Sequence, residues 1–303
     1  MFITITLNPA IDTMIFVDKL DNQKHANVIK KQKVAGGKGI NISKVLKQLN
    51  EKTFATGFLG GTNGKFISKE LSKLHIDHQF INIEGNTREN IKIFDQFSNE
   101  SFDINDQGPS CDMNHFNELI ILLKSLIKPK DVVIISGSAP IDFDADIYKI
   151  LIKEIKHLAD KIILDTSKAW FKEGLTATPD LIKPNLEELK EYANQQLDDE
   201  PTIIKEALKI CDTGVSEVLV SLGKIGSLYV SKKHIYKISV PDIKVYHTVG
   251  AGDALLAGFV SNVKKHDLEF ALKRATAISL AYIAHRDDIE VLHNLITIQD
   301  MKA

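Results

Sequence analysis

The 303-residue sequence is poor in the features on which several protein classes depend. It has only two cysteines, Cys111 and Cys211, far apart in the chain, so we expect buried thiols and neither a disulfide framework nor a zinc site. No apolar run approaches the ~18 residues that a membrane span requires. Lys and Arg number 38 against 40 Asp and Glu, and this balance offers no basic surface for nucleic acid or an anionic membrane. Met1–Leu7 lacks the basic region and cleavage site of a signal peptide, so we expect a cytoplasmic location.

Common catalytic signatures are missing as well. Gly37-Lys38 and Gly64-Lys65 are not followed by Ser or Thr, which excludes a Walker A loop. The stretch Gly250–Leu255 ends without a third Gly or Ala and lies near the end of the chain, so it is not a dinucleotide-binding fingerprint. The histidines show no pair at metal-ligand spacing with a carboxylate partner. Any phosphoryl transfer therefore needs a site other than a P-loop.

What the sequence does contain is an alternation of β-rich and helical segments. Hydrophobic residues make up 44% and charged residues 26%, which is typical of a globular protein. The alternation predicts an α/β fold, with a mainly parallel sheet and helices on both faces. The predicted strands are Phe2–Leu7, Phe54–Leu59, Val132–Ile135, Ile162–Leu164, Leu181–Ile182, Val218–Leu222, Ser227–Val230 and Ile235–Val240, and the predicted helices are Ile40–Leu49, Phe66–Leu74, Ile147–Leu158, Leu186–Ala193, Ala251–Val263 and Leu268–Ala284.

The stretch 79–104 interrupts this alternation. It contains short strands at His78–Ile83, Asn90–Asp95 and Ser101–Ile104, separated by turn residues, and no helix. We therefore expect a small β appendage that acts as a lid or a dimerisation flap. In open α/β sheets the ligand lies beyond the carboxyl ends of the strands, so the residues just after strands are the candidates for function.

The strongest motif, Thr248–Asp253, follows the last predicted strands and opens an apolar helix. Its small residues let consecutive N–H groups point outward at the helix N-terminus, which suits phosphate oxygens. Asp253 in the first turn could accept a proton from an attacking hydroxyl. The alternative is an ordinary helix start in which Asp253 is favoured by the helix dipole. Taken alone, the motif does not decide between the two.

Two further motifs lie near the N-terminus. Ala35–Asn41 combines glycines with a cationic donor and an amide, and Leu7–Asp12 places a carboxylate shortly after the first strand. The glycines would let the main chain approach a ligand, and Asp12 could accept hydrogen bonds from sugar hydroxyls. A flexible loop and a turn aspartate are the ordinary alternatives.

Three motifs complete the set. Asn86–Lys92 carries Arg88 and Lys92, either of which could reach an anionic group, although a solvated strand surface is the alternative. In Ile182–Glu188, Asn185 and Glu188 are three residues apart, so they could hold hydrated Mg²⁺ or form a capping box. Val220–Gly226 is a glycine-bracketed turn that suits either a hairpin or a nucleotide contact.

In this order, the motifs resemble those of the ribokinase-like (PfkB) carbohydrate kinases over essentially the whole chain, and most of all the 1-phosphofructokinase and tagatose-6-phosphate kinase branch. The resemblance implies one ribokinase-like domain over residues 1–303, with a three-layer α/β/α core and a β-lid from about 12–35 and 79–104. It rests on these segments: 7–12, 36–41, 87–88, 136–138, 165–167, 183–188, 221–223, 226 and 249–253.

The resemblance also implies roles for individual residues. Asp253 would be the general base, and the amides of Gly250, Ala251 and Gly252 would stabilise the transferring phosphoryl group. The other implied roles are sugar hydroxyl binding for Asp12, Gly37 and Asn41, binding of the sugar's own phosphate for Lys38, Arg88, Lys92 and Ser138, ATP binding for Lys183, Asn185, Ser221, Gly223 and Gly226, and water-mediated Mg²⁺ binding for Asn185 and Glu188.

The resemblance narrows the reaction without fixing the substrate. Cations at Lys38 and Arg88 favour a phosphorylated sugar, and the run Thr87–Lys92 favours ATP-dependent phosphorylation of fructose 1-phosphate at O6. Phosphorylation of tagatose 6-phosphate or fructose 6-phosphate at O1 is the alternative, and a catalytically silent sugar-phosphate sensor is an alternative of another class. A homodimer through the lid is expected. The sequence departs from the family pattern at His247, at Ala254 and in the segment 284–288, where we assign no purine contact.

Overall fold

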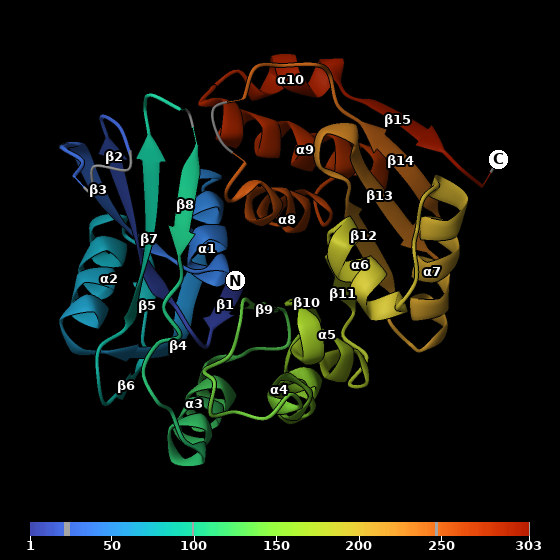
Figure 1. The fold of residues 1–303 in the computed structure, drawn as a ribbon. Coiled ribbons are helices and arrows are strands. Elements are labelled where there is room, and N and C mark those ends of the chain that lie inside the picture. Colours follow the sequence, from blue (N-terminus) through green and yellow to red (C-terminus); the bar gives the residue numbers. More distant parts are fainter. Residues whose placement is uncertain (21–24, 99, 246–247, 303) are drawn as a thin grey trace.

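The strands form two sheets of different size in the computed structural model, which describes residues 1–20, 25–98, 100–245 and 248–302 (Figure 1). The large sheet has 11 strands in the order β15-β14-β13-β12-β11-β10-β9-β1-β4-β5, with β6 also paired to β4. Its strands are β1 (Phe2–Thr6), β4 (Thr53–Gly60), β5 (Asp77–His78), β6 (Ile81–Ile83), β9 (Val132–Ser136), β10 (Lys161–Asp165), β11 (Leu181–Ile182), β12 (Glu217–Ser221), β13 (Gly226–Ser231), β14 (Ile235–Ser239) and β15 (Thr297–Asp300).

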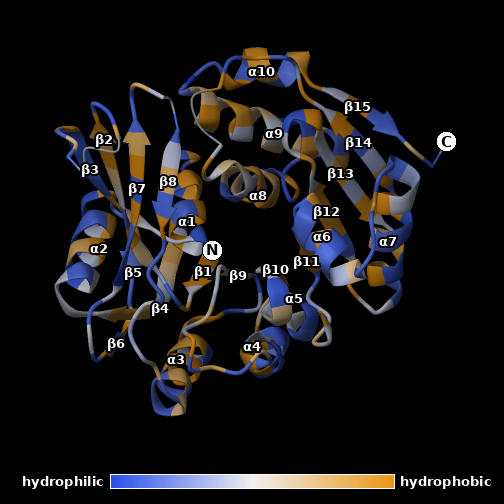
Figure 2. Cartoon of the chain, in the orientation of Figure 1, coloured by the Kyte–Doolittle hydropathy of each residue, from blue (hydrophilic) through white to orange (hydrophobic). Residues whose placement is uncertain are grey.

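Helices cover both faces of this sheet, because the central strands are parallel and buried on either side. One face packs against α1 (Lys38–Gln48), α8 (Ala251–Asn262), α9 (Leu268–Ala284) and α10 (Ile289–Leu295). The other packs against α3 (Met113–Leu126), α4 (Ile147–Ile155), α5 (Lys168–Leu175), α6 (Leu186–Ala193) and α7 (Glu200–Asp212). Peripheral helices such as α7 carry both hydrophobic and hydrophilic residues, as expected for helices with one buried and one exposed side (Figure 2). The predicted three-layer α/β/α core is confirmed.

Most of the predicted elements agree with the structure to within a few residues, but the start of one helix does not. Helix α2 (Gly61–Lys73) begins five residues before the predicted Phe66. Its first turn holds weak helix formers, but the side chain of Asn86 accepts a hydrogen bond from the Asn63 amide at 2.9 Å and so caps the turn from another part of the chain. Helices α3, α5, α7 and α10 were not predicted.

The small sheet has the strand order β3-β2-β7-β8 and lies beside the large one (Figure 1). Its strands are β2 (Ala10–Val17), β3 (Val28–Gly36), β7 (Arg88–Asp95) and β8 (Ser101–Ile104). The expectation that His78–Ile83 is one strand of this appendage is wrong. Strands β5 and β6 both pair with β4, because Ile81 and Ile83 are buried in the core of the large sheet.

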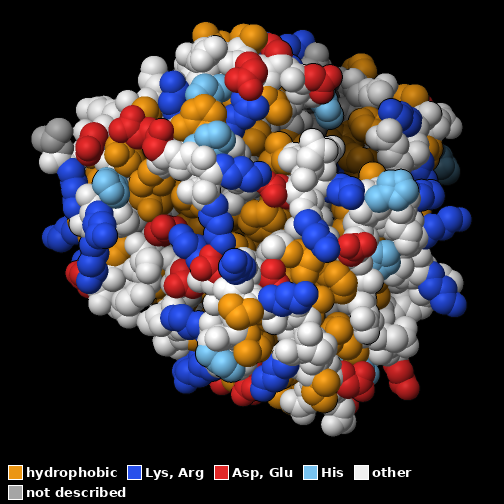
Figure 3. Space-filling view, turned by 180° about the vertical axis from the view of Figure 1, so that it is seen from behind, with side chains coloured by type: hydrophobic (Ala, Val, Ile, Leu, Met, Phe, Trp, Pro, Cys, Tyr) orange, Lys and Arg blue, Asp and Glu red, His pale blue; other side chains and the backbone are white. Residues whose placement is uncertain are grey.

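Lys and Arg side chains alternate with Asp and Glu over the face seen in Figure 3, without an extended area of one sign. Within the described residues, no helix is both long enough and apolar enough to span a bilayer. Cys111 and Cys211 are both buried free thiols, as expected.

Gly57 on β4 lies so close to β1 that a substitution there tests the packing of these two strands. Its φ is +142°, and a Cβ at this position would lie 1.8 Å from the carbonyl oxygen of Thr6. We expect Gly57→Ala to lower the free energy of unfolding by about 2–5 kcal/mol, from backbone strain and overpacking. Gly223→Ala is the control, because its φ is also positive but nothing lies within 4 Å of the added Cβ, and its cost should be about 1 kcal/mol. Equal shifts in the urea midpoints of the two variants would contradict this account.

Candidate active site

A cleft of about 1240 Å³ opens at the carboxyl ends of the parallel strands, between the small sheet and the start of α8. Every predicted site residue except one lines it: Asp12, Gly37, Lys38, Asn41, Arg88, Ser138, Lys183, Asn185, Glu188, Ser221, Gly223, Gly226, Gly250, Ala251, Gly252 and Asp253. The exception is Lys92. It lies on the same face of β7 as Arg88, but its ammonium group pairs with Asp103 at 3.2 Å and it does not line the cleft.

The start of α8 holds backbone N–H groups in the cleft. Gly250 has a φ of +82°, and a Cβ there would lie 2.8 Å from the ring of Tyr282, so this position requires glycine. The predicted three-amide anion site is only partly borne out by the geometry. The Ala251 amide donates to the Thr248 carbonyl at 3.2 Å, which closes a turn. The Gly252 amide, by contrast, donates to no backbone carbonyl among the described residues, and both Gly250 and Gly252 line the cleft.

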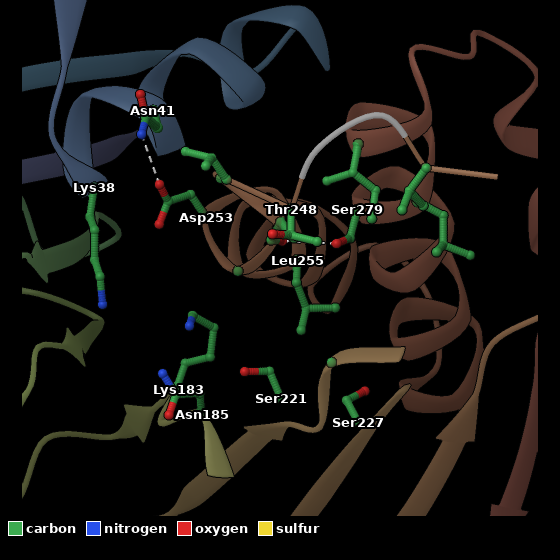
Figure 4. A pocket seen from close by; sticks show the side chains of 18 of the residues that line it. Lys38, Asn41, Lys183, Asn185, Ser221, Ser227, Thr248, Asp253, Leu255 and Ser279 are labelled. Carbon is green, nitrogen blue, oxygen red and sulfur yellow. Dashed lines mark hydrogen bonds between the residues drawn. The ribbon is translucent and has the colours of Figure 1, made fainter. Parts of the chain in front are cut away.

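Asp253 lies in the first turn of α8 and is almost completely buried. Its Oδ2 accepts a hydrogen bond from Nδ2 of Asn41 on α1 at 2.9 Å (Figure 4). Burial, and then the negative charge of Asp165, raise the pKa of Asp253 to about 6, while Asn41, Lys183 and Lys38 oppose the rise. A base with a pKa close to neutrality is suited to proton transfer at physiological pH.

Asp165, at the end of β10, joins two lysines beneath the cleft. Its Oδ1 lies 3.0 Å from Nζ of Lys38 and 3.5 Å from Nζ of Lys183. Burial alone would raise the pKa of this carboxyl, but the two ammonium groups outweigh it and hold the pKa below its usual range. Lys183 in turn lies against the start of α8, since a Cβ on Gly252 would be 3.0 Å from its Nζ. The sequence marked residues 165–167 only as part of the resemblance and gave Asp165 no role.

The small sheet supplies the opposite wall of the cleft. Asn90 on β7 donates to Oδ1 of Asp12 on β2 at 3.0 Å, and the Asp12 carboxylate occupies the space that a side chain on Gly36 would need. Arg88 donates to the carbonyl of Asn8 at 2.9 and 3.2 Å, and to the carbonyl of Asp106 at 3.2 Å. Its donors are thus bound to neutral carbonyls, and among the described residues no carboxylate forms an ion pair with it. A partly buried cation of this kind is suited to an anionic ligand.

Asn185 and Glu188 form the capping box that was one of their two predicted arrangements. The Asn185 Oδ1 accepts from the Glu188 amide and the Glu188 Oε2 accepts from the Asn185 amide, both at 2.8 Å. The other carboxylate oxygen of Glu188 lies 3.8 Å from Nζ of Lys38. Both side chains line the cleft, and their oxygens are the hard donors that Mg²⁺ prefers, so the donor set fits a water-mediated ion. Among the described residues, no three or more His, Cys, Asp or Glu side chains are grouped so that they could hold a metal ion directly.

The end of the cleft near β13 and α9 is apolar, and the sequence did not predict its walls. Leu255 of α8 faces a stripe of α9 whose residues follow the spacing i, i+3, i+4 and i+7. The stripe and the adjoining loop comprise Thr276, Ser279, Leu280, Ile283, Val240 and Ile243. The only signal in the sequence was the pair of small polar residues, Thr276 and Ser279, in the largely apolar second half of α9. His247, the departure noted above, lies outside the described residues.

The pKa of Asp253 leads to a pH prediction. A carboxylate must be ionised to accept a proton, so kcat/KM should fall about tenfold for each pH unit below about 6. The groups that act on Asp253 are Asp165, Lys183 and Lys38, with Tyr282 facing it from α9. Initial rates at low substrate concentration between pH 5 and 8 would measure the midpoint. A flat profile down to pH 5 would show that this carboxyl is not the titrating base.

Comparison with known proteins supports the same interpretation. Residues 5–294 match the model of the pfkB family carbohydrate kinases. The chain is 33% identical to a putative phosphofructokinase from Staphylococcus aureus, with a TM-score of 0.86 and 99% of each chain covered. It is 27% identical to a possible 1-phosphofructokinase from Thermotoga maritima, with a TM-score of 0.85 and 99% of each chain covered. It also shares the fold of phosphofructokinase-2 from Escherichia coli, solved with fructose-6-phosphate, at 23% identity and a TM-score of 0.87 over 97% of this chain and 98% of that one.

Proposed function

The chain belongs to the pfkB family of carbohydrate kinases, and on that premise we propose that it transfers the γ-phosphoryl group of ATP to O6 of fructose 1-phosphate, giving fructose 1,6-bisphosphate and ADP. It is a phosphofructokinase-like, ATP-dependent sugar kinase. The observation that carries the proposal is the position of Asp253, a buried carboxylate with a raised pKa in the first turn of α8, beside the glycines that line the cleft there.

In the proposed reaction Asp253 removes the proton from the sugar hydroxyl as its oxygen bonds to the γ-phosphorus. The bond from that phosphorus to the β,γ-bridging oxygen breaks, and ADP leaves with the bond's electron pair. The amides of Gly250 and Gly252 stabilise charge on the phosphoryl oxygens during transfer. Asn41 fixes the orientation of the base through its hydrogen bond. Mg²⁺ would be held through water by Asn185 and Glu188, and when bound it would neutralise phosphate charge.

The sugar is expected to lie between Asp253 and the small sheet. Asp12, held by Asn90, and the backbone near Gly37 would bind its hydroxyls, and Arg88 with Ser138 would bind the phosphate that it already carries. The nucleotide would extend from Lys183 past Ser221, Gly223 and Gly226 to the apolar stripe of α9, which suits a purine ring.

The choice among ketose phosphates is tested by measuring ADP release with fructose 1-phosphate, fructose 6-phosphate and tagatose 6-phosphate. We expect the highest kcat/KM with fructose 1-phosphate. Preference for either 6-phosphate would move the site of phosphorylation to O1 and contradict the proposed substrate. Binding of all three without ADP release would identify a silent sensor.

We also propose that two copies associate through the face of the small sheet that is turned away from the cleft. Strand pairing places Ile91 opposite Ile104 and Ile93 opposite Phe102, so these four apolar side chains share one face. Phe102 is 48% exposed and Ile104 is 55% exposed. Light scattering should give a dimer mass for the wild type and a monomer mass for Phe102→Glu. Phe97→Glu in the adjoining turn is the control, and a monomeric wild type would contradict the proposal.

A further inference from the structure

We infer that Lys38, held in place by Asp165, acts on the phosphoryl group being transferred and not on the phosphate that the sugar already carries. This inference rests on the proposed function and differs from the role that the sequence resemblance implied for Lys38. It makes Lys38 a catalytic residue and Asp165 its positioning residue.

The position of the Lys38 ammonium group is the first ground. Lys38 begins α1, and its side chain extends away from Asn41 toward the strand ends that carry Lys183 and Asn185 (Figure 4). Its Nζ lies 3.0 Å from Asp165 Oδ1 and 3.8 Å from Glu188 Oε1. Asp165 Oδ1 is also 3.5 Å from Nζ of Lys183, which lies beside Gly252 at the start of α8. Two ammonium groups therefore meet one carboxylate oxygen where the predicted base and the start of α8 converge.

The contrast with Arg88 is the second ground. Arg88 is bound to the carbonyls of Asn8 and Asp106, and the negative charges that act on it are those of Asp12 and Asp106. Lys38 is acted on by Asp165, Glu188 and Asp253. The two cations therefore belong to different parts of the cleft. Arg88 lies with the small sheet, where the sugar binds, and Lys38 lies with the base and the proposed magnesium ligands, where the phosphoryl group crosses.

The carboxylates around Lys38 and Arg88 support the same assignment of the two cations. Lys38 has two carboxylates near it before any ligand binds, whereas the described residues supply Arg88 with none at ion-pair distance. A site for a resident dianionic phosphate needs a cation that is not already held in an ion pair, and Arg88 meets this condition among the described residues. A lysine already compensated by carboxylates is fixed in position, and fixed charges stabilise a transition state without reorganising.

Asp165 has the surroundings that a positioning residue needs. It is fully buried, and its pairing partner on β9 is Ser136. Within the described residues, Asp165 Oδ2 has no hydrogen-bond partner, and neither does the Ser136 hydroxyl. The carboxylate is thus held ionised by its two lysines, and it holds them in return.

The experiment compares Lys38→Met with Arg88→Ala in two measurements. Calorimetry without nucleotide gives Kd for fructose 1-phosphate, and steady-state kinetics gives kcat at saturating substrates. We expect Lys38→Met to lower kcat by about 10²–10³, the effect of losing one group that stabilises a transition state, with Kd within about threefold of wild type. Arg88→Ala should raise Kd by about 10–150-fold. Lys69→Met on the exposed face of α2 controls for the loss of a charge.

The inference is overturned if Lys38→Met weakens sugar-phosphate binding as much as Arg88→Ala does, or if its kcat equals that of wild type. Lys38→Arg, which retains the charge, should recover part of kcat. If wild type acts on none of the ketose phosphates, the proposed function fails together with the inference. If wild type turns over and only the Lys38 result differs, the inference alone fails.

Asp165→Asn tests the positioning role separately. It keeps the shape of the side chain but removes the charge that holds both lysines, so kcat should fall at least about tenfold with Kd for fructose 1-phosphate unchanged. Because the Asp165 charge contributes to the raised pKa of Asp253, the acid limb of kcat/KM should also move to lower pH. A merely structural change would leave that limb in place, and an unmoved limb with wild-type kcat would remove Asp165 from the mechanism.

Discussion

Replacing Asp253 by Asn should lower kcat by about 10²–10⁴, the range expected for the loss of a general base. The substitution preserves volume and leaves an amide that Asn41 can still approach, so substrate affinity should change little. The loss should appear in kcat and kcat/KM together, because proton transfer is needed only in the transition state. Coupled measurement of ADP release at saturating ATP and ketose phosphate provides the test.

The stability of the same variant distinguishes lost chemistry from lost folding. Ionised at neutral pH, the buried carboxylate of Asp253 destabilises the fold, and this cost is relieved as the pH falls through about 6 toward the ordinary value of 3.8. Asn carries no charge, so Asp253→Asn should have a Tm equal to or above that of wild type at pH 7.5. A variant with wild-type Tm and wild-type kcat would exclude Asp253 as the base.

The parts of the fold that sequence predicted well are those with a local physical cause. The apolar runs of β9 and β10 and the apolar stretches of α8 and α9 are visible in the local sequence, and their bounds agree closely. Two elements whose bounds were predicted wrongly depend on distant partners. Helix α2 starts where Asn86 caps it, and β6 joins the large sheet because β4 lies beside it. Neither partner is adjacent in sequence.

In the active site too, features with a local sequence signal were predicted and contacts between distant residues were not. Glycine-rich loops and polar residues at strand ends marked the positions that line the cleft, because those features are visible in the sequence. The pairing of Lys38 with Asp165 was not visible, since 127 positions separate them and they meet only because the start of α1 packs beside β9, the neighbour of β10. The bond from Ala251 to Thr248 was also missed, because which amides remain available depends on the turn geometry.

Arg88→Ala should raise KM for the phosphorylated sugar by about 10–150-fold while kcat changes only a few-fold, since hydrogen bonds to a charged group are worth about 1.5–3 kcal/mol. Arg88 starts β7 beside Ala10 of β2, where the small sheet meets the large one. Among the described residues, the Arg88 guanidinium donates only to backbone carbonyls. Replacing Arg88 by Ala therefore breaks no ion pair and should lower the free energy of unfolding only slightly. Circular dichroism and Tm of the variant check that point.

The KM for ATP distinguishes a sugar-phosphate role of Arg88 from the alternative roles. If Arg88 binds the sugar's own phosphate, KM for ATP should stay within about twofold, and Arg88→Lys should recover part of the lost affinity because it retains the charge but not the two-pronged geometry. A nucleoside kinase on the same fold has an uncharged acceptor and would tolerate Arg88→Ala without a change in KM. An unchanged KM would therefore contradict the assignment of a phosphorylated substrate, and a parallel rise in KM for ATP would place Arg88 on the nucleotide instead.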